Sequence, residues 1–201
     1  MSVHRRPGNP RQGWLIAGPH AFPVALGRGG IKANKREGDG GTPRGRFRLK
    51  RLWWRGERHV RPPTLLPARR IRPDDGWCEN PADRRYNQAV KVPRSSKADR
   101  LARADELYDF IIEIDHNSRP RIAGRGSAVF IHVARPRFAS TAGCIALKID
   151  TLRRLLARLG PRTTIVVDLP LTRLRGYRCL STTQIPRSHN FRIKSIEYVP
   201  C

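Results

Sequence analysis

The feature that most constrains the fold is the length of the apolar runs, which are short and separated by Gly, Pro and Arg. The clearest runs are residues 13–18 (GWLIAG), 21–27 (AFPVALG), 107–115 (LYDFIIEID) and 127–133 (SAVFIHV). Runs of this length, bounded by turn residues and containing β-branched and aromatic side chains, are typical of strands and not of a helical bundle. We therefore expect a mainly β fold.

The chain has 201 residues, which suits one domain with a real core and is short for two. Gly18-Pro19-His20 joins the first two runs and predicts a hairpin that opens the domain. Residues 27–45 are rich in glycine and predict an extended loop, and residues 55–105, rich in Arg, Pro and Asp, predict an insertion or lid. Residues 169–201 have no stable period. We expect a domain over 13–168 followed by a C-terminal tail.

One helix is predicted late in the domain. Residues 149–159 (IDTLRRLLARL) place four leucines on one helical face, namely Leu152, Leu155, Leu156 and Leu159. Asp150 is the expected N-cap and Gly160-Pro161 the expected stop. Residues 163–167 (TTIVV) then predict a strand that closes the domain.

The charge balance indicates an anionic partner. The chain has 41 Lys+Arg against 16 Asp+Glu, a formal net charge of +25. Nucleic acid, an acidic membrane surface and an anionic cell wall all satisfy that requirement. With four Trp in the chain, a basic nucleic-acid-binding domain is one alternative. The basic residues are scattered, so a solvated surface is another.

The cysteines do not indicate a metal site. They stand at positions 78, 144, 179 and 201, without the CxxC or Cys/His spacing of a zinc site. We expect neither a metal nor a cofactor, and a single disulfide stays open. No run reaches the 18 or so apolar residues of a membrane span, and the first residues, MSVHRRPGNPRQGW, show no signal peptide.

Cys144 stands out from the other cysteines because of its neighbours. It lies in a turn of small residues, 140–147 (STAGCIAL), just before a hydrophobic and then helical segment. Small residues leave the sulfur accessible, and backbone amides of such a turn can converge on an oxyanion. A nearby helix start or imidazolium would favour the thiolate. The alternative is a buried, inert cysteine.

His132 ends the apolar run 128–131, where a polar ring in a predicted strand needs a reason. If its ring reaches the sulfur of Cys144, it can act as base and later as acid, with a backbone carbonyl fixing the tautomer. The alternative is a structural hydrogen bond at a strand end.

Two motifs resemble a known family. The stretch 130–147 (FIHVARPRFASTAGCIAL) resembles the signature of the YkuD-type L,D-transpeptidases, in which a His after an apolar strand precedes Ser/Thr-x-Gly-Cys-Ile-x-Leu. The stretch 39–47 (DGGTPRGRF) resembles a second hallmark, Thr-Pro-x-Gly-x-Phe after a glycine-rich loop. The sequence departs from the pattern at Ala142, where many members have His, and at Ala146, where many have Arg. The resemblance covers roughly residues 13–168 and implies a YkuD-like mixed β-sandwich or barrel with one helix after the cysteine loop.

The resemblance also implies roles for individual residues. Cys144 is the implied nucleophile, His132 the proton donor and acceptor, and the carbonyl of Val133 the group that orients the ring. The amides of Gly143 and Cys144, together with Ala142, form the implied oxyanion site, in a turn that also contains Thr141. Arg135 and Arg137 lie between base and nucleophile, where they could hold a stem-peptide carboxylate or be solvated surface arginines.

The implied reaction is L,D-transpeptidation of peptidoglycan stem peptides. Cys144 attacks the third stem residue, expels D-Ala, and the thioester passes to an amine of a neighbouring stem to give a 3→3 cross-link. Water in place of the amine would make the chain an L,D-carboxypeptidase. The expected partners are stem peptides and the anionic cell wall, and not nucleic acid, with the chain acting as a monomer. Such an enzyme belongs in the periplasm or at the cell wall, although the sequence shows no export signal.

Overall fold

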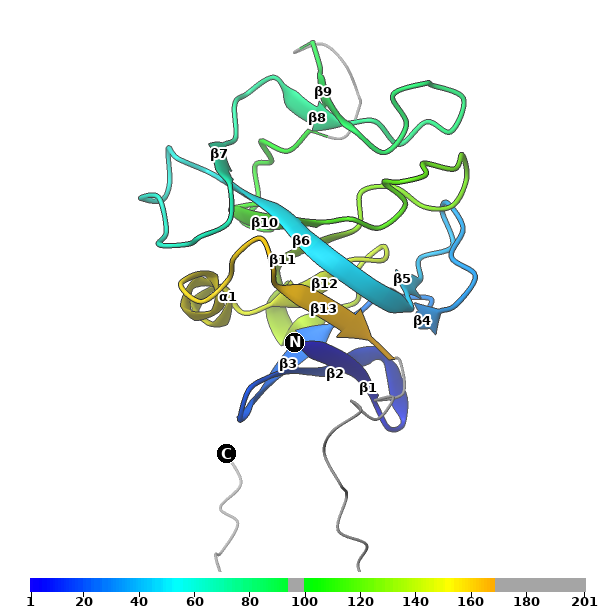
Figure 1. Ribbon diagram of the computed structural model, residues 1–201, viewed down its shortest axis with the longest axis vertical. Coiled ribbons are helices and arrows are strands. Elements are labelled where there is room, and N and C mark those ends of the chain that lie inside the picture. The colour runs from blue at the N-terminus through cyan, green and yellow to red at the C-terminus, as the bar shows by residue number, and fades with distance from the viewer. Residues whose placement is uncertain (94–99, 169–201) are drawn as a thin grey trace, which may run out of the picture. The chain divides into compact units, whose positions relative to one another are not determined.

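A barrel of eight strands is the main element of the structure, a computed structural model that describes residues 1–93 and 100–168. The strands are β1 (Ser2–Arg6), β2 (Asn9–Ala17), β3 (His20–Ala25), β6 (Gly45–Trp54), β10 (Phe110–Ile114), β11 (Phe130–Val133), β12 (Ile145–Leu147) and β13 (Thr164–Val167). Their order is β10-β11-β12-β3-β2-β1-β13-β6, and β6 pairs with β10 to close the barrel (Figure 1). The predicted mainly β fold is confirmed.

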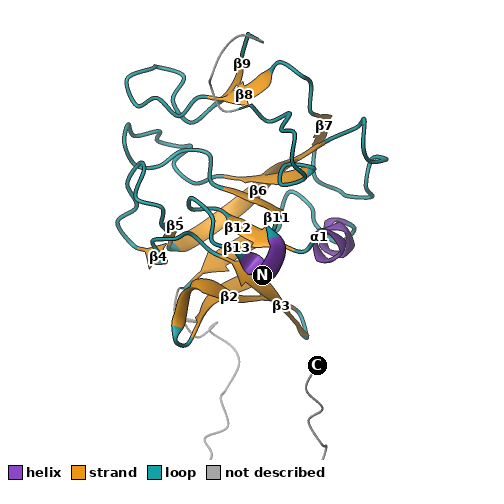
Figure 2. Ribbon diagram, turned by 180° about the vertical axis from the view of Figure 1, so that it is seen from behind, coloured by secondary structure: helices purple, strands orange, loops and turns teal. Residues whose placement is uncertain are grey.

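Shorter strands lie outside the barrel. β7 (Ala68–Arg70) runs parallel to the end of β6, β4 (Ile31–Lys32) pairs with β5 (Thr42–Pro43), and β8 (Asp75–Trp77) pairs with β9 (Ala89–Lys91). The only α-helix among the described residues, α1 (Ile149–Leu156), follows β12, as expected (Figure 2). None of the helices in the described part of the chain is long and apolar enough to cross a membrane.

The predicted hairpin is present as β2 and β3, which pair in antiparallel register. A strand that the sequence analysis did not expect, β1, precedes it and pairs with β2 on one side and with β13 on the other. Val3 of β1 is fully buried, whereas Arg5 and Arg6 are exposed. A strand with one buried apolar side chain and several basic ones gives little hydrophobic signal, which explains why it was missed.

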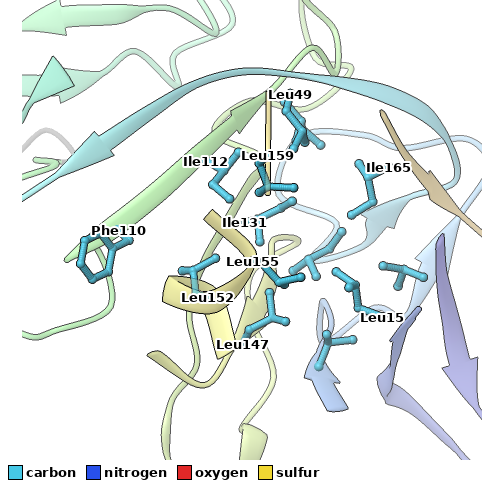
Figure 3. Packing of buried hydrophobic residues seen from close by; sticks show 14 of the residues in the cluster. Leu15, Leu49, Phe110, Ile112, Ile131, Leu147, Leu152, Leu155, Leu159 and Ile165 are labelled. Carbon is cyan, nitrogen blue, oxygen red and sulfur yellow. The ribbon is translucent and has the colours of Figure 1, made fainter. Parts of the chain in front are cut away.

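The helix packs its leucines into the main core of the domain. Leu152 and Leu155 of α1, followed by Leu159, lie among apolar side chains of the barrel strands (Figure 3). The predicted buried face is therefore confirmed, but both predicted ends were wrong. The N-cap is Lys148, without a side-chain hydrogen bond. Asp150 lies within the first turn, where the helix dipole stabilises a carboxylate.

The helix ends at Leu156 and not at Leu159. The amide of Arg158 donates to the carbonyl of Leu155, and the amide of Leu159 donates to that of Leu156. These bonds span three residues instead of four, so the chain tightens into a turn while Leu159 stays buried.

The segment 55–105 is more structured, in its described part, than its composition indicated. It contains β7, β8 and β9 and contributes Ile71, Trp77 and Leu101 to a second apolar cluster. The other members of this second cluster include Trp53, Ile111, Ala128, Phe130 and Cys144. Single apolar residues between Arg and Pro carry no period, which is why sequence reasoning predicted little structure there. Its function as a lid stays a prediction, and the tail 169–201 lies outside the described residues.

Candidate active site

The pleat of two neighbouring strands brings His132 and Cys144 to one face. β11 and β12 run parallel with His132 opposite Ala146. Because side chains alternate along a strand, Cys144, two residues before Ala146, shares the face of His132. Their neighbours Ile131 and Ile145 belong to the main core on the other face. The separation of twelve positions in the sequence is thus closed by strand register.

Both side chains open into one cleft of about 380 Å³. Cys144 is 7% exposed and His132 is 5% exposed, so both lie at its base. The walls come from residues 28–38, 103–108 and 127–129 and from the loop between β11 and β12, and they include Arg28, Glu37, Tyr108, Ser127, Arg135 and Ala142. The cleft is polar at its walls and apolar beneath, where the second cluster lies.

The imidazole of His132 is held as a neutral base. Its Nδ1 donates a hydrogen bond of 2.8 Å to the carbonyl of Val133, which leaves Nε2 without a hydrogen. Burial lowers the pKa of His132 to about 4, against the opposing effect of the Val133 carbonyl, and the positive charges of Arg135 and Arg103 add to the lowering. The ring of Tyr108 meets it edge-on at 5.5 Å. At neutral pH the ring therefore has no charge, so the imidazolium expected beside Cys144 is absent in this state.

The sulfur of Cys144 is held by backbone groups at the start of β11. Sγ lies 3.2 Å from the carbonyl of Ala128, to which the thiol donates, and 3.3 Å from the amide of Phe130. Ala128 has a positive φ of 50°, unusual for a residue with a side chain. This kink explains why β11 begins at Phe130 and not at the predicted Ser127.

A buried asparagine fixes that kink from the 55–105 segment. The side-chain carbonyl of Asn87 accepts from the amide of Ala128 at 3.2 Å and from the indole of Trp77 at 3.1 Å. Its amide donates to the carbonyls of His116 and Asn117. All four hydrogen-bonding positions of this side chain are used, so Asn87 couples the segment to Ala128, whose carbonyl holds the sulfur of Cys144.

The cysteine loop is locked by Thr141. Its hydroxyl donates to the carbonyl of Cys144 at 2.7 Å and accepts from the amide of Gly143 at 3.1 Å. Gly143 has a φ of 143°, and a Cβ there would lie 2.8 Å from the carbonyl oxygen of Gly41. Only glycine fits this position. Ala142, between them, is exposed and lines the cleft.

A helix start does not assist the sulfur, contrary to the expectation from sequence. Cys144 is followed by the strand β12, and α1 begins only at Ile149. The helix dipole acts within about one turn of the helix end, so it does not reach Cys144. A short apolar run such as Ile145–Leu147 is equally compatible with the beginning of a helix and with a strand.

The glycine-rich loop is joined to the cysteine loop by hydrogen bonds. The hydroxyl of Thr42 accepts from the amide of Gly27 at 2.9 Å, and the next amide, of Arg28, donates to the carbonyl of Thr141 at 2.9 Å. A Cβ on Gly27 would lie 2.1 Å from the carbonyl oxygen of Gly40. The two sequence motifs are therefore in contact through their backbones, which glycine permits.

The two arginines between His132 and Cys144 are placed differently. Arg135 lines the cleft, whereas Arg137 is exposed and is not among the residues that line it. Arg137 lies in a 3-10 turn, η1 (Pro136–Phe138), with a positive φ of 55°. Its carbonyl accepts from the side chain of Gln12 at 3.2 Å, so this residue belongs to the barrel surface.

Sequence reasoning missed several polar residues of the cleft. Glu37 and Ser127 line it, and Tyr86 and Asn87 hold its walls from the 55–105 segment. Glu37 stands two residues before Asp39 of the recognised motif, and this proximity was the available signal. The other residues are distant in sequence and carry no local pattern.

The described residues contain no cluster of His, Cys, Asp and Glu able to hold a metal ion. Cys78 and Cys144 form no disulfide within the described residues, and Cys179 and Cys201 lie outside them.

A closed β-barrel with a cysteine and a neutral histidine on one face of adjoining strands defines a cysteine-dependent enzyme domain. The model of the family YkuD, L,D-transpeptidase catalytic domain, matches residues 13–167. The chain therefore belongs to the YkuD family of cysteine-dependent L,D-transpeptidases, with a function in peptidoglycan metabolism. A search of curated proteins and a search of solved structures returned no match.

Proposed function

We propose that this protein is a peptidoglycan L,D-transpeptidase in which Cys144 is the nucleophile and His132 the base. The observation that carries the proposal is the strand register, which places a buried thiol and a neutral imidazole on one face at the base of a cleft. The Val133 carbonyl supports the assignment, because it leaves Nε2 as the acceptor for a proton.

In the first step the thiol leaves the Ala128 carbonyl and gives its proton to Nε2 of His132. Sγ attacks the carbonyl carbon of the third stem residue, at the L-centre of diaminopimelate. The C–N bond to D-Ala breaks, and the imidazolium returns its proton to the departing amine. The products of this step are a thioester on Cys144 and free D-Ala, with His132 neutral again.

In the second step an amine of a neighbouring stem attacks the thioester. It gives a proton to Nε2, the C–S bond breaks, and the thiol of Cys144 is restored. The new amide is the 3→3 cross-link. Burial of Cys144 above the second apolar cluster limits access of water to the thioester, which favours the amine over hydrolysis.

The oxyanion of each step needs donors from the cysteine loop. We assign the amides of Gly143 and Cys144, with the Gly143 amide exchanging its bond to the Thr141 hydroxyl for one to the oxyanion. One such donor lowers the activation barrier by about 3 to 4 kcal/mol. Thr141 and Ala142 then shape the turn, and Arg135 holds a carboxylate of the stem peptide.

Incubation with a purified disaccharide tetrapeptide and mass analysis of the products tests the proposal. Loss of D-Ala with formation of a dimer is expected for the wild type and for Cys78→Ala, and neither product is expected for Cys144→Ala. Loss of D-Ala without a dimer would identify an L,D-carboxypeptidase with the same residues. An unchanged substrate would refute the enzyme assignment.

We also propose that the protein acts as a monomer in the periplasm or at the cell wall, where its net charge of +25 favours the anionic wall. Fractionation of cells and light scattering of the purified chain test these two statements.

A further inference from the structure

The charged groups that line the cleft divide into paired and unpaired ones. Lys35 pairs with Asp39 at 2.7 Å, and Arg103 pairs with Asp105 at 2.7 Å. Burial alone would raise the pKa of Asp39, but the bond from Lys35 and two backbone amides outweigh it and hold that pKa at about 2. These two cations are thus neutralised within the protein. Glu37, which lines the same cleft, is not neutralised in this way.

Glu37 is a half-buried carboxylate without a cationic partner. It lines the cleft, and it takes part in none of the ion pairs between residues 1–93 and 100–168. Arg28, which lines the same cleft and comes from the same loop, also forms no ion pair among these residues. The cleft therefore offers a carboxylate, Glu37, and two guanidinium groups, Arg28 and Arg135, that form no ion pair within the described part of the protein.

Hydroxyl groups hold the Glu37 carboxylate in a fixed direction. Its Oε2 accepts from the hydroxyl of Ser127 at 2.7 Å and from the hydroxyl of Tyr86. Burial and the Glu37 carboxylate itself raise the pKa of Tyr86, so this hydroxyl keeps its hydrogen and donates it. The amide of Gly126 in turn donates to the Tyr86 oxygen at 3.0 Å.

The other oxygen of Glu37 keeps acceptor capacity. From residues 1–93 and 100–168, Oε1 receives only a long bond of 3.3 Å, from the amide of Gly38. An ionised carboxylate accepts about four hydrogen bonds, and three are made here, so a further strong donor can bind. An oriented, partly desolvated carboxylate with this vacancy is suited to an ammonium group.

We infer that Glu37 binds the ammonium group on the side chain of the third residue of the donor stem, with Arg28 taking the carboxylate on the same carbon. This inference rests on the proposed function and adds to it the two residues of this chain that distinguish a side chain ending in a zwitterion from one that carries a single charge. An ammonium held by a carboxylate stays protonated and cannot attack a thioester. The site therefore belongs to the donor stem and not to the acceptor amine.

Three donor tetrapeptides that differ only at the third residue test the side-chain ammonium and the side-chain carboxylate separately. Diaminopimelate carries both groups, L-lysine keeps the ammonium without the carboxylate, and L-2-aminopimelate keeps the carboxylate without the ammonium. The readout is kcat/KM for release of D-Ala. A charge-assisted hydrogen bond corresponds to about a 10- to 100-fold difference, so the wild type should prefer diaminopimelate over 2-aminopimelate by that factor.

Glu37→Gln keeps an acceptor for Tyr86 and Ser127 but removes the charge. It should lower kcat/KM about 10- to 100-fold for the diaminopimelate and lysine donors and change it less than about threefold for 2-aminopimelate. Glu79→Gln is the matched control, because it removes a carboxylate from the same cleft. This control should leave the preference among the donors unchanged. Glu37→Asp, which retains the charge, should retain the preference for donors with an ammonium.

The possible outcomes distinguish a failure of the proposed function from a failure of the assignment of Glu37. If the wild type releases D-Ala from none of the donors, the proposed function fails and the inference fails with it. If the wild type accepts all donors and Glu37→Gln lowers them equally, the function stands and Glu37 is only a structural residue. A variant too unstable to assay moves the test to the wild type, where equal kcat/KM for diaminopimelate and 2-aminopimelate overturns the inference.

Discussion

Acid should destabilise this protein through His132, and the size of the effect follows from its burial. Burial lowers the pKa of His132 from 6.5 to about 4 in the folded chain. Between these values the unfolded chain binds a proton that the folded chain does not, so the free energy of unfolding falls as the pH falls. With about 1.36 kcal/mol per pKa unit, the loss from His132 between pH 7 and pH 4 is about 3 kcal/mol.

Urea unfolding at several pH values between 7.5 and 4 measures this effect. The comparison is with His132→Asn, whose amide can still donate to the carbonyl of Val133 but does not titrate. The difference between wild type and variant should change by about 3 kcal/mol across this range, with the wild type losing more stability in acid. Other titrating groups are common to both proteins and cancel in the difference.

An exposed histidine provides the control. His20 lies at the surface, so His20→Asn should follow the wild type at every pH. In the same range kcat/KM of the wild type should stay level down to about pH 5 and fall near pH 4, as His132 gains a proton and ceases to be a base. A difference between wild type and His132→Asn that does not vary with pH would refute the neutral, buried imidazole.

Three further predictions concern the surroundings of the site. Gly143→Ala, whose Cβ would meet the carbonyl of Gly41 at 2.8 Å, should displace the cysteine loop and reduce D-Ala release at least 100-fold. Gly8→Ala is also strained, at a φ of 74°, but its Cβ would meet no atom within 4 Å in the turn between β1 and β2, so D-Ala release should not fall. Asn87→Ala should lower the free energy of unfolding by about 3 kcal/mol in urea titrations, because it leaves buried partners at Trp77 and Ala128 unsatisfied, while Asn80→Ala at the surface should change it by less than about 0.5 kcal/mol. A chain that ends at Asp168 should retain the thermal transition and D-Ala release of the full chain, since the barrel closes with β13; loss of the transition would place the tail within the core.

Most of the barrel strands could be predicted from the sequence, and Cys144 and His132 could be proposed as the catalytic pair, because their signals are local. Cys144 lies in a turn of small residues, His132 interrupts an apolar run, and the strand period then determines which side chains share a face. The register between β11 and β12 places the two side chains on one face of the sheet, which the sequence only suggested. The signal failed where a run was too short to carry a period, as for Ile145–Leu147 before the helix.

The walls of the cleft could not be predicted in this way, because they depend on contacts between distant segments. Glu37 meets the hydroxyl of Tyr86 across 49 positions and that of Ser127 across 90. Asn87 reaches Ala128 across 41 positions. None of these residues lies in a periodic run, and a polar residue in a loop usually indicates only solvent exposure. Tertiary packing alone turns them into a site.

The imidazole of His132 carries no charge in the resting site, and this follows from its depth. His132 is neutral because burial disfavours the imidazolium, and the thiol of Cys144 donates to the carbonyl of Ala128. An ion pair at the base of the cleft would lack water to solvate it. Charge therefore develops only as Sγ attacks a bound carbonyl and the oxyanion meets the amides of the cysteine loop. In the proposed mechanism the proton transfer to His132 and the attack on the donor are then coupled, so we expect Cys144 to become nucleophilic only when a stem peptide occupies the cleft.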